Sequence, residues 1–162
     1  MTRMPIINPT RERIEQLGRE APDTKPIVMV NLLKFRELAD YGERAPAGDS
    51  GRKAYSRYSK AVMPLLWEVG GQPLWMGAAR AGVIVPHGES WDEVLLVHYP
   101  SRSAFLRMVM SKAYQAVMHH RTAALADSRL IETRAMPLPR WILGAARGLM
   151  RAKALVFPKI AR

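Results

Sequence analysis

Two polar residues interrupt the otherwise apolar stretch IVMVNLLKF at residues 27–35: the amide Asn31 and the ammonium Lys34. Burying an unpaired amide costs roughly 2–7 kcal/mol, and burying an unpaired charge costs more. Each must therefore have a partner, and a bound ligand could be one. Successive side chains of a strand face opposite sides of a sheet, so the two occupy different environments. The one that points into a cavity is a candidate ligand contact, and the other should meet a helix or the strand end.

Histidines supply the groups that titrate near neutral pH. His98 follows the apolar run VLLV, so on a cavity-lining face it would be an acid, a base or a ligand contact. The alternative is a hydrogen-bonded histidine at a strand end. His119 could join Tyr55 or Tyr58 in a polar cluster at a cavity mouth. Its neighbour His120 points about 100° away on a helix, so the two do not chelate one metal, and no metal site is predicted.

Aromatic residues could line a ligand site. Tyr55 and Tyr58 are three residues apart and share one helix face, while Trp75 and Trp91 flank the next apolar segments. Such residues are either core or ligand contacts, and their spacing leaves both readings open. Asn31, His98 and His119 are therefore the candidate catalytic residues. The candidate ligand-binding residues are Lys34, Tyr55, Tyr58, Trp75 and Trp91.

The elements that must position these residues follow from hydrophobic periodicity and turn residues. A short helix after Thr10, ended by Gly18, precedes the strand at 27–35, and a long polar loop spans 36–51. The expected elements after it are a helix at 52–69, a hairpin of strands at 73–86 and 91–100, a helical region at 101–127 and a strand at 128–134. The order βαββαβ predicts an α+β, ferredoxin-like domain with an antiparallel sheet.

Local signals refine three of these elements. Pro64 predicts a kink or break in the helix at 52–69, because proline lacks the N–H that the helix ladder needs. The glycines at 77 and 82 predict a bend or bulge in the strand at 73–86. Ser101 or Ser103 should cap the next helical region, which should break near Ser111.

Composition narrows the function classes. The chain has 162 residues, enough for one domain, and a net charge of +11. Six of its basic residues and no acidic ones lie after residue 134, so the body is only moderately basic and nucleic acid is not a favoured partner. The absence of cysteine excludes disulfides and thiolate metal sites. No secretory signal or membrane span is seen, which favours a cytoplasmic location.

The C-terminal residues form a separate feature. Residues 136–162 are expected to be an appended basic amphipathic helix, with Trp141, Ile142 and Leu149 on one side and Arg147 and Arg151 on another. It could pack on its own or a partner subunit, or residues 138–157 could lie on an anionic membrane. The expected division is an N-terminal helical extension at 1–24, a ferredoxin-like domain at 25–135 and this helix.

The segments MVNLLKF, AYSRYSKAVMPLL, the Gly-Gly turn, WDEVLLVHYPS, AYQAVMHHR and DSRLIETR occur in an order that resembles domain-of-unknown-function family 1330. The resemblance covers Lys25 to Arg134. It implies membership of the dimeric α/β-barrel superfamily, in which two ferredoxin-like sheets pack face to face. A homodimer is therefore expected, with both faces of the strand at 27–35 covered.

The resemblance also suggests chemistry. Some superfamily members degrade haem with an Asn, a Trp and a His in one cavity, and Asn31, Trp75 or Trp91, and His98 invite that comparison. The spacing does not match closely enough to transfer those roles, so no cofactor is assigned and haem is the alternative. The leading hypothesis is a small-molecule enzyme or binder, such as a cofactor-free oxygenase or isomerase, with a cavity between sheet and helices. The competing hypothesis is a membrane or partner-binding protein that acts through residues 138–157.

Overall fold

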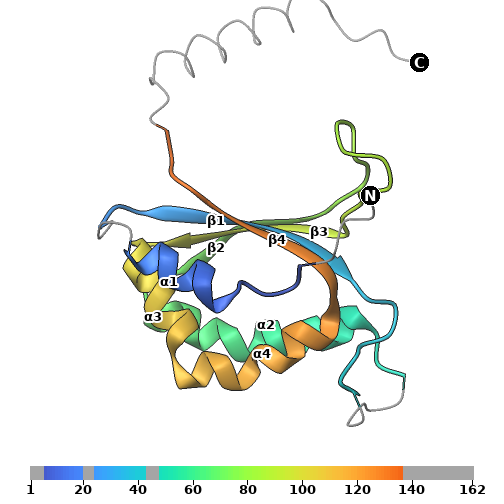
Figure 1. The fold of residues 1–162 in the computed structure, drawn as a ribbon, viewed down its shortest axis with the longest axis horizontal. Helices are drawn as coiled ribbons and strands as arrows, with labels where there is room; N and C mark the ends of the chain where they lie inside the picture. Colours follow the sequence, from blue (N-terminus) through green and yellow to red (C-terminus); the bar gives the residue numbers. More distant parts are fainter. Residues whose placement is uncertain (1–5, 20–23, 43–47, 137–162) are drawn as a thin grey trace, which may run out of the picture.

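The computed structural model describes residues 6–19, 24–42 and 48–136 of the chain, and it forms two layers, a sheet above a set of helices (Figure 1). The elements in chain order are α1 (Arg11–Arg19), β1 (Ile27–Phe35), α2 (Gly51–Glu68), β2 (Gln72–Ala78), β3 (Glu93–Tyr99), α3 (Arg102–Met110), α4 (Lys112–Ala124) and β4 (Leu125–Thr133).

The four strands form one antiparallel sheet in the order β2-β3-β1-β4. All described helices lie on one side of it, with α2 beside α4 beneath the strands (Figure 1). This order and the βαββαβ succession confirm the expected ferredoxin-like fold, with the second helical region divided into α3 and α4.

The alternation of side chains along β1 sets the two faces of the sheet. Ile27, Met29 and Leu33 point to the helices and are almost fully buried, whereas Val28 and Val30 point the other way and are half-buried. We call the side that faces the helices the inner face and the other side the outer face. The core lies entirely under the inner face, where Leu33 and Leu125 are 0% exposed.

Serine caps divide the second helical region as expected. The hydroxyl of Ser101 accepts a hydrogen bond from the Ala104 N–H at 3.1 Å and begins α3. Ser111 adopts an extended conformation between α3 and α4, and its hydroxyl accepts from the Tyr114 N–H at 3.1 Å. A serine satisfies free N–H groups at a helix start, so one residue ends the first helix and begins the second.

The predicted break at Pro64 and the predicted position of the bulge in β2 are corrected. α2 runs without a break through Pro64, which is exposed, so the carbonyl that loses its N–H partner can be solvated. The bulge in β2 falls between Pro73 and Trp75 rather than at the glycines. Pro73 has no N–H to donate to the strand ladder, which favours an irregularity beside it.

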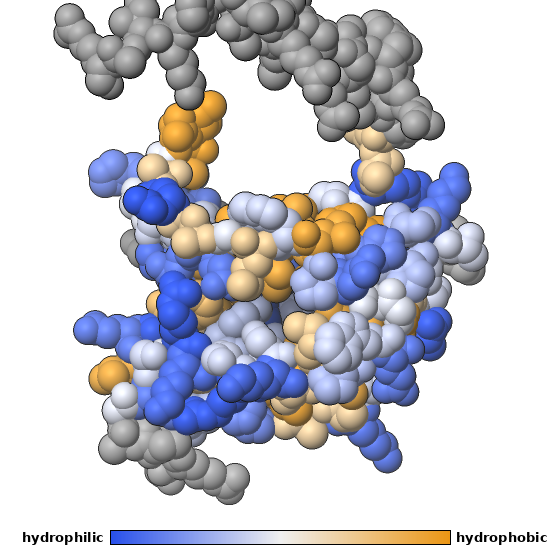
Figure 2. Space-filling model, turned by 180° about the vertical axis from the view of Figure 1, so that it is seen from behind, coloured by the Kyte–Doolittle hydropathy of each residue, from blue (hydrophilic) through white to orange (hydrophobic). Residues whose placement is uncertain are grey.

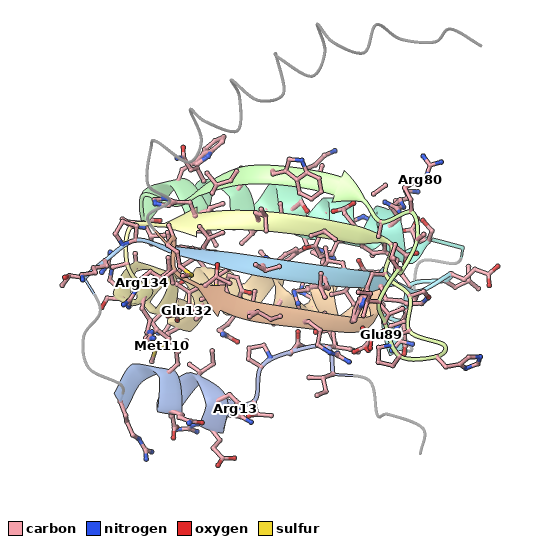
Figure 3. The ribbon with its side chains drawn as sticks, turned by 90° about the horizontal axis from the view of Figure 1, so that it is seen from above. Arg13, Arg80, Glu89, Met110, Glu132 and Arg134 are labelled. Atoms are coloured by element: carbon pink, nitrogen blue, oxygen red, sulfur yellow. The ribbon has the colours of Figure 1, made fainter. Side chains whose placement is uncertain are left out.

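The expected strand at 73–86 is also shorter than predicted. β2 ends at Ala78, and residues 79–92 form a loop in which Val83 and Ile84 are 92% and 95% exposed. The C-terminal end of the loop is hydrogen-bonded to β1, because Asp92 donates its N–H to the Leu33 carbonyl at 2.8 Å. Figure 3 looks onto the outer face and shows this loop running from Arg80 near the end of β2 to Glu89 at the same end of the sheet.

The expected C-terminal helix at 136–162 lies almost wholly outside the described residues. Within the part of the chain that the structure covers, no helix is long and apolar enough to cross a membrane.

The loop before α2 contains an ion-pair cluster that should make stability depend on pH. Asp49 is 8% exposed and contacts Lys53 Nζ at 2.8 Å and the Arg57 guanidinium. Hydrogen bonds from Lys53 and then Arg57 lower the pKa of Asp49 below its ordinary value of 3.8. A lowered pKa in the folded state stabilises the fold above pH 3.8, and this stabilisation is lost as pH falls through the lower value.

We therefore expect Asp49→Asn to be less stable than the wild type at about pH 6, with the difference shrinking below about pH 4. Thermal unfolding of both proteins across this range measures the difference. Lys53→Gln should weaken the same pH dependence, since it removes the largest contribution to the shift. A difference that stays constant with pH would contradict this assignment.

Candidate functional site

A large cavity lies between the inner face of the sheet and α2, α3 and α4, with a volume of about 1220 Å³. Seen from the side that carries β2, the surface is hollowed between the two layers (Figure 2). The lining is mainly apolar and aromatic; its apolar side chains include Met29, Val62, Leu66, Leu95, Val97, Phe105, Met108 and Met118. An apolar cavity of this kind, with a few polar groups, is the usual form of a small-molecule site.

Two phenol hydroxyls meet inside this cavity. Tyr58 on α2 and Tyr114 on α4 are each 8% exposed, and their oxygens are 3.1 Å apart. Burial raises the pKa of Tyr58 well above its usual value, and the neighbouring phenols raise it further. The Tyr58 hydroxyl therefore keeps its proton at neutral pH. One hydroxyl donates to the other, which leaves the second proton available to an acceptor in the cavity.

Tyr55 and Tyr99 add two further phenols to the lining. They are 7% and 5% exposed, and burial is the largest cause of the raised pKa of each. Neither hydroxyl has a hydrogen-bond partner among the described residues, and neither oxygen is fully enclosed. They are thus additional neutral donors within reach of a ligand.

Asn31 is the polar residue of β1 that faces this cavity. Its side-chain N–H group donates to the carbonyls of Met29 and Leu95, both at 3.3 Å. These hydrogen bonds satisfy the donors of the part-buried amide nitrogen and fix the orientation of the side chain. The amide oxygen has no donor within the described part of the chain, and the residue lines the cavity. Asn31 therefore offers an acceptor to a ligand.

Arg121 on α4 is a buried cation at the cavity wall, only 5% exposed. Its guanidinium donates to the carbonyl of Ile7, to Asn8 Oδ1 at 2.7 Å and to Ser128 Oγ at 3.1 Å. These bonds tie the segment before α1 to α4 and β4. All three acceptors are neutral.

Lys34, Trp91 and His98 do not share the cavity with Asn31. His98 pairs with Val28, and Lys34 is at an even position of β1, so both belong to the outer face. The Lys34 ammonium donates to Ser90 Oγ, and the Arg129 guanidinium lies 5.1 Å from the centre of the Trp91 ring. Within one chain, these three predicted residues therefore occupy the side opposite the cavity.

Trp75 lies on the edge strand β2, at the border of the cavity. It pairs with Leu96, whose side chain is on the outer face, so Trp75 also belongs to that face. A Cβ on Gly77 would lie 2.4 Å from the Trp75 ring, which places this ring on the same outer face. Asn31, Trp75 and His98 thus do not converge on one space in a single chain. The comparison with haem-degrading relatives is not supported by this arrangement.

His119 is exposed and lies away from Tyr55 and Tyr58. Its Nδ1 is 2.8 Å from the Ala116 carbonyl, and its ring lies 6.3 Å from that of Tyr41. His120 is 2.7 Å from the Tyr41 hydroxyl. Burial, then the charges of His119 and Arg57, lower the pKa of His120, so it is neutral at neutral pH. The predicted cluster of His119 with the α2 tyrosines is therefore replaced by one with Tyr41.

Sequence reasoning missed Tyr114 and Arg121 as cavity residues. A signal was present in their spacing, because residues seven apart lie on one helix face, and here that face also carries Val117 and Met118.

Comparisons with known proteins place this chain in a family. The model of the domain of unknown function DUF1330 matches residues 50–133. The crystal structure of RPA0582, a protein of unknown function from Rhodopseudomonas palustris, is 34% identical, with a TM-score of 0.73 over 82% of this chain and 98% of that one. The methylated form of RPA0582 gives 34% identity and a TM-score of 0.74 over 83% and 98% of the two chains. The comparison with curated proteins found no match.

Proposed function

This chain belongs to the DUF1330 family of unknown function, and we propose that it binds a small organic molecule in the cavity beneath its sheet. The observation that supports the proposal most is the combination of a large apolar space with hydroxyls that have no hydrogen-bond partner among the described residues. Natural cores are packed to about the density of organic crystals, so a cavity of about 1220 Å³ is far larger than a packing defect.

The polar groups of the cavity suggest how a ligand would be held. The spare hydroxyl proton of the Tyr58–Tyr114 pair and the hydroxyl of Tyr55 would donate to a ligand oxygen, and Asn31 would accept from a ligand donor. Neutral donors in an apolar site also stabilise charge that develops on a carbonyl oxygen. That property suits an isomerase or a cofactor-free oxygenase, and we propose these reaction classes if the bound molecule is transformed.

A neutral fluorescent probe, N-phenylnaphthylamine, tests the cavity. Ser59 is half-buried on α2 and lines the cavity, so Ser59→Trp should fill part of it and weaken probe binding at least about tenfold, about 1.4 kcal/mol. The matched control is Ser103→Trp, because Ser103 is exposed on α3 and is not part of the lining. Equal probe affinity of Ser59→Trp and the wild type would reject the cavity as the binding site.

We also propose that the chain forms a homodimer through the outer face. In the single chain, Trp75 and Ile131 are 53% and 50% exposed on this face, and Val28, Val30 and Leu96 are only half-buried. His98 Nδ1 is buried there without a hydrogen-bond partner among the described residues. A second copy packed on this face would cover the apolar side chains, as the two-sided burial expected for β1 requires.

A further inference from the structure

We infer that the molecule bound in the cavity is an organic anion, a carboxylate or phenolate with an apolar body, whose charged group lies against Arg121. This inference deepens the proposed function and rests on it. It names the chemical class of the ligand and the residue that selects that class.

The charge of Arg121 has no counterion in the described protein. Its three acceptors are a backbone carbonyl, an amide oxygen and a hydroxyl, and no carboxylate of the described residues lies within salt-bridge distance. Two of its five N–H groups have no acceptor within the residues that the structure covers. A buried cation without a counterion is costly, and an anion that enters the adjacent cavity would offset this cost.

The other charges of the lining cancel. Glu15 contacts Arg11 at 2.8 Å, and Glu93 contacts Arg52 at 3.4 Å, and all four residues border the cavity. These arginines are 94% and 61% exposed, so their charges are largely solvated. The remaining uncompensated charge of the described lining is the buried one, on Arg121.

The phenols lie in the field of that charge. The charge of Arg121 lowers the pKa of Tyr55 and of Tyr58, against the larger opposite effect of burial, so it acts on both rings. An anionic oxygen between Arg121 and these hydroxyls would receive a charge-assisted hydrogen bond and one or two from neutral donors. Such hydrogen bonds are shorter and stronger than those between neutral groups. The apolar side chains around them would take the body of the molecule.

The experiment compares naphthoate with naphthamide, which share one apolar body and differ in charge. Titration calorimetry with the full chain should show naphthoate binding at least about tenfold more tightly, about 1.4 kcal/mol. Arg121→Gln should remove this preference and Arg121→Lys should retain part of it. The control Arg107→Gln should keep the preference, because Arg107 is exposed on α3 and does not line the cavity. Because Arg121 is buried, the preference should persist at about 1 M salt, which screens exposed charges.

Equal affinity of the wild type for the two probes would overturn the inference, and this comparison needs no variant to fold. Retention of the full preference by a folded Arg121→Gln would also overturn it. If neither probe binds but N-phenylnaphthylamine does, the anion inference fails and the cavity proposal stands. If none of the three binds, both fail.

Discussion

Gly51→Ala is expected to destabilise the fold by about 3 kcal/mol or more, a large part of the roughly 5–15 kcal/mol that stabilises an ordinary domain. A Cβ at position 51 would lie 2.4 Å from the carbonyl oxygens of both Ala124 and Arg36. These are backbone atoms, so no side-chain rotation relieves the contact. Gly51 begins α2 beneath the end of β1, where its N–H donates to the Arg36 carbonyl at 3.1 Å.

The same junction positions the candidate site. Arg36 donates its N–H to the Ala124 carbonyl at 2.9 Å, so the start of α2, the end of β1 and the end of α4 meet there. A displacement at Gly51 should therefore separate α2 from α4 and lengthen the contact between Tyr58 and Tyr114.

Thermal and urea unfolding measure the effect of Gly51→Ala. Gly18→Ala is the control, since a Cβ there meets only Leu106 at 3.9 Å on an exposed part of α1. That change should be neutral or stabilise by about 0.5 to 1 kcal/mol, because alanine favours helix more than glycine does. A Gly51→Ala protein as stable as Gly18→Ala would contradict the structure of this junction.

Ile131→Asp is expected to convert the proposed homodimer to monomers. Ile131 pairs with Val30 on the outer face and is 50% exposed in the single chain. A twofold interface contains each substitution twice, so it would bury two carboxylates among apolar side chains. At about 1 to 3 kcal/mol for each carboxylate, the association constant should fall at least about thirtyfold.

Native mass spectrometry and sedimentation velocity, at the same protein concentration for each variant, measure this change. Leu38→Asp is the matched control, because Leu38 is 66% exposed in the loop after β1 and lies outside the sheet. The control should remain dimeric. A wild-type chain that is monomeric at high micromolar concentration, or an Ile131→Asp chain that stays dimeric, would reject the outer face as the interface.

Local patterns in the sequence were sufficient to predict the elements and most of their boundaries. The apolar run with two polar exceptions identified β1, and the twofold period of a strand assigned Asn31 and Lys34 to opposite faces. A serine hydroxyl satisfies free N–H groups at a helix start, so the sequence predicted a cap at Ser101 or Ser103 and a break near Ser111. The structure has caps at Ser101 and Ser111. The order of these elements then determined the ferredoxin-like fold.

Tertiary structure decided where β2 ends. Residues 79–86 carry the β-favouring Val83, Ile84 and Val85, so their composition predicted a longer strand. A strand also needs a hydrogen-bonding neighbour, and β3 begins only at Glu93, which is paired with Ala78. Beyond the pair of Ala78 and Glu93, no described strand lies beside residues 79–86. Val83, Ile84 and Val85 therefore remain in an exposed loop.

The alternation of side chains along a strand shows that two residues face opposite sides of the sheet, but it does not show which side packs against the helices. The packing of α2, α3 and α4 decided this, and so placed Asn31 in the cavity and His98 outside it. The same packing brought Tyr58 to Tyr114 across 56 residues of sequence and buried Arg121 against a segment more than a hundred residues away. Contacts over such separations depend on how whole elements pack, and periodicity within one element carries no information about them.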